Sequence, residues 1–120
     1  MRWLLVLLAC AGCKRQADAP PPPGPESPAA PVMPASEVRR GQDACKAYVD
    51  QVCACADPVP AMKQPCALAR ALPEAMQVGL DVATNPESSR RDVLQAEASV
   101  RKIAKECIEQ ITRLPAAGCP

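Results

Sequence analysis

The cysteines constrain this chain more than any other residue type. Eight of them occur in 120 residues, six of these after Ser36, and the chain has no Phe and no His. Burial in residues 36–120 therefore depends on Leu, Val, Ile, Ala and Met, and a core of that size supplies about 3–5 kcal/mol at most. We expect disulfides, formed in an oxidising compartment, to hold the fold together.

The charge and the missing residue types exclude several functions. Lys and Arg number 14 against 13 Asp and Glu, so no basic excess exists for phosphates and nucleic acid is not an expected partner. Without His, Ser–His and Cys–His nucleophile arrangements are impossible. The carboxylate pairs Glu106/Glu109 and Asp43/Asp50 are typical of solvated helix faces. We expect neither an enzyme nor a cofactor.

The first dozen residues predict an export signal. Met1-Arg2 precedes a short apolar run from Trp3 to Ala9, far below the roughly 20 residues that span a bilayer. Residues 1–12 are therefore predicted to be a signal peptide that is removed.

This leader resembles that of bacterial lipoproteins, in which small residues precede a cysteine that receives a diacylglyceryl group and becomes the new N-terminus. Leu7-Leu8-Ala9-Cys10 has the usual leucine three places before the cysteine, whereas Cys10-Ala11-Gly12-Cys13 has the favoured Ala-Gly pair. Lipidation of Cys13 leaves an even six cysteines for disulfides, so Cys13 is preferred and Cys10 is the alternative. The resemblance implies a lipid anchor in the bacterial cell envelope. It also implies the outer membrane, because Lys14 stands where an Asp retains such proteins at the inner membrane.

Residues 13–35 are expected to comprise the lipidated N-terminus and a proline-rich linker. Eight of the 15 prolines lie between Pro20 and Pro34. Such a segment has almost nothing apolar to bury and favours polyproline II. We expect a disordered spacer that reaches at most about 70 Å.

Apolar residues recur at helical spacing over residues 36–120 and predict an all-α domain. The first helix is expected from Ser36 to about Ala56. The second runs from about Gln64 to Ala83, with a kink or break after Leu72 caused by Pro73, and its apolar residues are spread as for a helix with neighbours on both sides. The third begins at Asn85 as N-cap and ends before Pro115. The prediction is a three-helix, up-down-up bundle with a kinked second helix, or with four helices if Pro73 breaks the second.

The cysteine spacing leaves two disulfide schemes open. Both contain Cys55–Cys66, the most economical pair because these residues flank the first turn. Parallel first and third helices give the further pairs Cys45–Cys107 and Cys53–Cys119; antiparallel ones give Cys45–Cys119 and Cys53–Cys107. The second scheme resembles saposin-like domains, but the spacing of these cysteines departs from theirs and no activity is carried over.

The predicted function is a lipid-anchored cell-envelope protein that presents a small, disulfide-stabilised helical domain. The whole pattern is similar to the small cysteine-rich, Ala/Pro-rich lipoproteins of high-GC bacteria. The expected partners are the membrane, through the anchor, and an unidentified envelope protein. The alternative is an envelope copper- or zinc-binding protein that uses Cys53, Cys55 and Cys66, because closely spaced thiolates bind soft metal ions.

Overall fold

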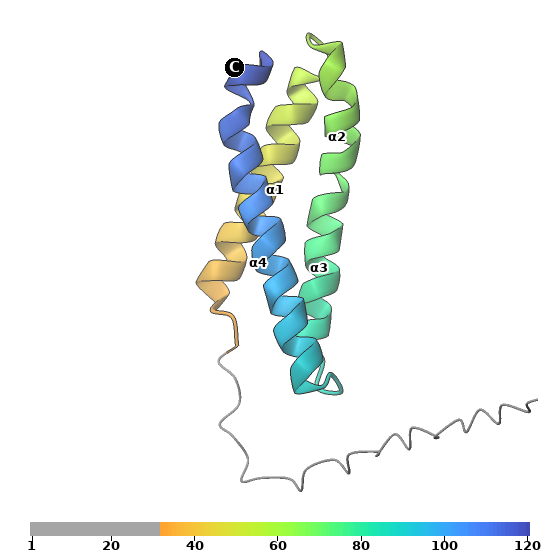
Figure 1. The fold of residues 1–120 in the computed structure, drawn as a ribbon, viewed down its shortest axis with the longest axis vertical. Helices are drawn as coiled ribbons and strands as arrows, with labels where there is room; N and C mark the ends of the chain where they lie inside the picture. The colour runs from red at the N-terminus through yellow and green to blue at the C-terminus, as the bar shows by residue number, and fades with distance from the viewer. Residues whose placement is uncertain (1–31) are drawn as a thin grey trace, which may run out of the picture.

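The computed structural model describes residues 32–120. The expected signal peptide, the lipidated cysteine and most of the linker lie outside these residues. The described part contains helices but no strand: α1 (Ala35–Cys55), α2 (Lys63–Ala69), α3 (Ala71–Thr84) and α4 (Arg90–Arg113), with single 3₁₀ turns at Pro60–Met62 and Pro115–Ala117. In Figure 1, α2 and α3 form one bent arm that runs opposite to α1 and α4. The predicted all-α, three-helix, up-down-up bundle is confirmed.

Helix α4 is the central element. It packs along both α1 and α3, whereas α1 and α3 contact each other little, and in Figure 1 the first turns of α1 diverge from α3. Two glycines allow α1 and α3 to approach α4 closely. A Cβ at Gly41 of α1 would lie 2.9 Å from the Cβ of Ala104, and one at Gly79 of α3 would lie 2.8 Å from a methyl group of Val100. Both contacts are shorter than side chains tolerate, so each crossing depends on its glycine.

The break in the second arm differs from the prediction by two residues. It falls at Arg70, between α2 and α3, whereas the expected place was after Leu72. Pro73 is still the physical cause, because it has no N–H for the carbonyl of Ala69 and its ring displaces that carbonyl. The hydrogen-bond ladder is therefore interrupted one turn before the proline, and Pro73 itself lies in the first turn of α3.

Helix α4 begins four residues later than predicted. The side chain of Asn85 accepts a hydrogen bond from the backbone N–H of Glu87 at 2.9 Å, so Asn85-Pro86 forms the turn that reverses the chain and not a helix start. The N-cap is Ser89, whose Oγ accepts from the backbone N–H of Asp92 at 3.2 Å while the Asp92 carboxylate accepts from the backbone N–H of Ser89. This capping box fixes the first turn of α4.

The core is small and rich in sulfur. Its fully buried side chains are Cys45, Val52, Met76, Val100, Cys107 and Cys119. The other buried members of this core include Met33, Tyr48, Ala69 and Leu114. Cysteines and methionines supply the volume that aromatic residues fill in larger domains.

Candidate functional site

All six cysteines of the described residues form disulfides. The pairs are Cys45–Cys107, Cys53–Cys66 and Cys55–Cys119. The first is the pair expected for parallel first and third helices. The other two correct the prediction, since Cys53 and Cys55 exchange the partners expected for them and the antiparallel scheme does not occur.

The faces of α1 explain this exchange. Cys53 and Cys55 are two residues apart on a helix and therefore point about 160° away from each other. Cys53 meets α2, which carries Cys66, whereas Cys55 is buried beside the C-terminal tail that carries Cys119. The expected Cys55–Cys66 pair would close a loop only two residues shorter, a difference of about 0.15 kcal/mol in the chain-entropy model. The direction of each side chain thus outweighs loop length.

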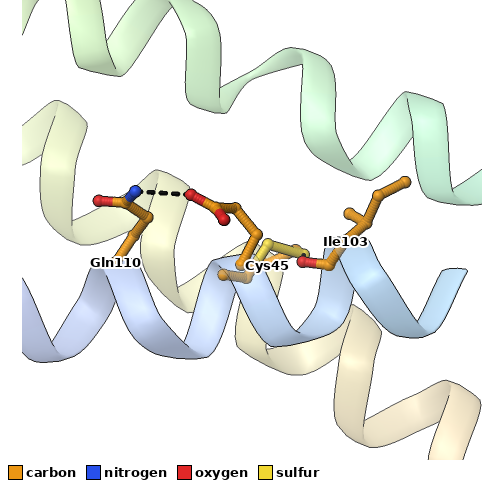
Figure 2. Close-up of a disulfide and its surroundings, with 5 residues drawn as sticks. Cys45, Ile103 and Gln110 are labelled. Carbon is orange, nitrogen blue, oxygen red and sulfur yellow. Dashed lines mark hydrogen bonds between the residues drawn. A yellow bond between two sulfur atoms is a disulfide. The ribbon is translucent and has the colours of Figure 1, made fainter. Parts of the chain in front are cut away.

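The Cys45–Cys107 disulfide lies where α1 and α4 are close together (Figure 2). Both cysteines are completely buried, their Cα atoms are 4.9 Å apart, and the carbonyl oxygen of Ile103 lies 3.8 Å from the Cys45 sulfur. Packed helices usually have their axes 8–10 Å apart. Because α1 and α4 bring two Cα atoms within 4.9 Å at this disulfide, the side chains one turn away must be small. Gly41 and Ala104 occupy those positions.

The suggested metal ligands Cys53, Cys55 and Cys66 are not thiolates in this structure. Cys53 and Cys66 are bonded to each other and Cys55 to Cys119, and a disulfide sulfur lacks the negative charge that binds a soft metal ion. Within residues 32–120, no group of three or more Cys, Asp or Glu side chains is arranged to hold a metal ion.

Three of the four acidic residues considered from the sequence make local contacts along their own helices. Asp50 pairs with Lys46 at 2.7 Å and Glu109 with Lys105 at 3.7 Å. Glu106 accepts a hydrogen bond from Gln110 at 2.6 Å, drawn in Figure 2. These contacts are those of exposed helix surfaces.

A buried carboxylate, which the sequence reasoning missed, joins the linker to the bundle. Oε1 of Glu97 accepts a hydrogen bond from the backbone N–H of Met33 at 2.8 Å, and the Glu97 side chain is 5% exposed. Arg101 lies 3.9 Å from the other Glu97 oxygen and donates to Glu37 at 2.7 Å. This hydrogen bond to Glu37 raises the pKa of Arg101. We call Met33, Glu37, Glu97 and Arg101 the linker junction.

The junction changes the expected boundary of the domain. Met33 is 7% exposed and packs in the core, although it lies in the segment expected to be a disordered spacer. The folded part therefore begins before residue 36. One sequence signal could have located the site: Glu97 stands within the apolar stripe of α4, next to Ala96 and three residues before Val100, and a charge there needs a partner.

Two surface grooves flank α4. The junction groove, about 580 Å³, lies between α1 and α4 beside the linker junction and includes Gly41, Ala104 and Ile108. The hairpin groove, about 460 Å³, lies between α3 and α4 and includes Val78, Gly79, Gln95 and Ile103. Both have more apolar than polar lining, and both are edged by apolar side chains open to solvent: Ile108 is 50% exposed and Val78 is 59% exposed. These are the candidate interaction surfaces.

Comparison with known proteins does not identify the chain: no protein family, no curated protein and no solved structure matches it. Over residues 32–120, none of the helices combines the length and the apolar character that a membrane span requires.

Proposed function

We propose that the protein is a lipid-anchored component of the bacterial cell envelope that holds a small, disulfide-stabilised helical domain on a proline-rich stalk, for interaction with another envelope protein and not for catalysis. The proposed anchor is Cys13, with Cys10 as the alternative, and the proposed location is the outer membrane.

The linker junction is the observation that carries this proposal. A free peptide tail would leave its backbone groups to water, whereas the N–H of Met33 is held by a buried carboxylate of α4. Where the stalk meets the domain, it therefore has one defined position on the bundle. The start of α1 lies towards one end of the bundle in Figure 1, and the C-terminus lies at the other. A stalk attached in this way would leave the bundle from a fixed point, beside the junction groove.

The disulfides support the compartment in this proposal. Three disulfides in the described domain are typical of export to an oxidising environment. The leader before residue 13 supplies a route to that environment, and the proline-rich segment supplies the distance from the membrane.

Metabolic labelling with a fatty-acid analogue tests the anchor. We expect the wild-type protein and the Cys10→Ser variant to be labelled and to fractionate with membranes, and the Cys13→Ser variant to lose both properties. Labelling that survives in Cys13→Ser moves the anchor to Cys10, and absence of label from the wild type overturns the lipoprotein proposal.

Separation of inner and outer membranes tests the location. We expect the wild-type protein in the outer-membrane fraction and a Lys14→Asp variant shifted towards the inner membrane. Equal labelling of the two proteins is the control, since both retain Cys13. Wild-type protein found in the inner membrane contradicts the outer-membrane assignment.

A further inference from the structure

The Cys53–Cys66 disulfide is the most accessible of the three bridges. Cys53 is partly exposed, whereas each of the other five cysteines in residues 32–120 is at most 6% exposed. The other two bridges therefore bury both of their residues, and this one has a residue at the surface. Thiol–disulfide exchange begins with the approach of a thiolate to one of the two sulfur atoms. Such a thiolate reaches this bridge more easily than the others.

Helix α2 is held against α1 mainly by this bridge. It is seven residues long, and isolated helices shorter than about 12–15 residues are marginal in water. Its buried residues are Cys66 and Ala69, and the first of these is itself half of the disulfide. Leu68, the largest apolar side chain of α2, is 66% exposed. Packing alone therefore gives α2 little reason to stay on α1.

The segments on either side of α2 allow it to move without the rest of the bundle. None of residues 57–62 is buried, and after α2 the helix is interrupted at Arg70. The other two disulfides join α1 to α4 and to the C-terminal tail, and α3 has its own packing along α4. Release of residues 57–70 from α1 therefore requires one covalent bond to break and leaves the other two bridges intact.

We propose that Cys53–Cys66 is a thiol–disulfide exchange site whose co-reactant is a dithiol, and that its reduction releases residues 57–70 while the rest of the bundle stays folded. The broken bridge, of sequence separation 13, no longer limits the conformations of the opened segment. Loss of that constraint makes opening about a hundredfold more favourable. Neither the lipid anchor nor the envelope partner proposed above takes part in this exchange.

The exchange is a two-electron reduction of the bridge. One thiolate of the dithiol attacks Sγ of Cys53, a bond forms between these two sulfurs, and Cys66 leaves as a thiolate. The second thiolate of the dithiol then attacks the dithiol sulfur in this mixed disulfide, and Cys53 leaves as a thiolate. The dithiol becomes a disulfide, and the two cysteines take up the two protons that the dithiol lost.

Partial reduction of the full-length protein in detergent tests the exchange site. Dithiothreitol is the probe; aliquots are quenched in acid, unfolded and alkylated, so that burial does not hinder the labelling. Trypsin places Cys66, Cys107 and Cys119 on separate peptides, which identifies the bridge that has opened. We expect Cys66 to be alkylated about tenfold faster than the other two, because access controls the rate. Equal rates for the three peptides, or earlier labelling of Cys107 or Cys119, overturn the proposal.

Hydrogen exchange tests the release of α2. The Cys53→Ser/Cys66→Ser variant lacks the bridge without any reductant. Its amides in residues 57–70 are expected to take up deuterium about a hundredfold faster than those of the oxidised wild type. Helix α4 should stay protected over the same short interval. Unchanged uptake in residues 57–70, or loss of protection throughout the bundle, contradicts a local release.

Leu68→Ala is the matched control, because it removes the largest apolar side chain of α2 and keeps the disulfide. Since Leu68 is exposed, this variant should show the uptake of the wild type in residues 57–70. Uptake as fast as in the double serine variant would mean that packing, and not the bridge, holds α2, and would refute the proposal.

Discussion

Replacing Gly41 by alanine should destabilise the protein, although alanine is the better helix former. In an exposed helix interior this substitution stabilises by about 1 kcal/mol. Here the new Cβ would lie 2.9 Å from the Cβ of Ala104, whereas ordinary carbon contacts are about 3.5–4.0 Å. Neither atom can rotate away, since both are fixed to helix backbones, so the helices themselves would have to separate.

The Cys45–Cys107 disulfide opposes that separation. It lies about one turn from Gly41 and holds the two Cα atoms 4.9 Å apart. Overpacking of a rigid core costs about 1–3 kcal/mol, and the upper part of this range applies where a covalent bond prevents relaxation. After the gain in helix propensity is subtracted, we expect Gly41→Ala to lower the free energy of unfolding by about 1–2 kcal/mol.

A double-mutant cycle with Ala104→Gly separates the two effects. In that background the opposing Cβ is absent, and Gly41→Ala should stabilise by about 1 kcal/mol. The coupling energy is then about 2–3 kcal/mol, measurable by urea unfolding of the oxidised protein. Gly79→Ala should also destabilise the protein, because its Cβ would lie 2.8 Å from a methyl group of Val100, a buried valine whose χ1 rotation is restricted in a helix. Stabilisation by Gly41→Ala in the wild type, or an equal cost in both backgrounds, would refute the reasoning.

Three further predictions concern the junction, the disulfides and the helix cap. Met33→Ala should lower the free energy of unfolding by about 2 kcal/mol, whereas Val32→Ala, at a side chain 65% exposed, should leave the urea midpoint unchanged. Removal of the Cys53–Cys66 bridge, of sequence separation 13, should lower the free energy of unfolding by about 3 kcal/mol. Removal of the Cys45–Cys107 bridge, of separation 62, should lower it by about 4 kcal/mol, and the reverse order would contradict loop entropy as the cause. Hydrogen bonds from the N-cap Ser89 lower the pKa of Asp92. The ionised Asp92 carboxylate therefore stabilises the folded protein above the ordinary pKa of 3.8, and this stabilisation is lost as the pH falls through the lowered pKa. Acid titration of stability should show this component in the wild type and not in Asp92→Asn.

Local patterns in the sequence were sufficient for the fold class. Helical periodicity together with Pro58, Pro60 and Pro115 marks where the chain must leave a helix, and parallel first and third helices bring Cys45 to Cys107. The sequence did not determine the partners of Cys53 and Cys55, because loop entropy differs little between the possible pairs. That choice depends on which neighbour each face of α1 meets, which is a tertiary property.

The start of α4 and the start of the folded part were misjudged for a different reason. Asn85-Pro86 and Ser89 are both good helix-start signals. Ser89 becomes the N-cap only because the chain must first reverse its direction between α3 and α4. Met33 lies among prolines, so composition assigned it to the linker. Its burial depends on a carboxylate 64 residues away, which no local pattern contains.

The positions of the three disulfides determine how the domain would respond to mechanical load. A force applied at residue 32 first breaks the linker junction and then peels the opening turns of α1 away from α4. The Cys45–Cys107 bridge stops this peeling, because beyond Cys45 the pull passes through a covalent bond into α4. Only the roughly 13 residues before Cys45 can be drawn out, to a total span of at most about 45 Å. The tail beyond Cys107 is bonded to the end of α1 through Cys55–Cys119. The end of the bundle that contains this disulfide therefore stays folded while the first turns of α1 unfold under tension, and these turns can re-form when the tension is released.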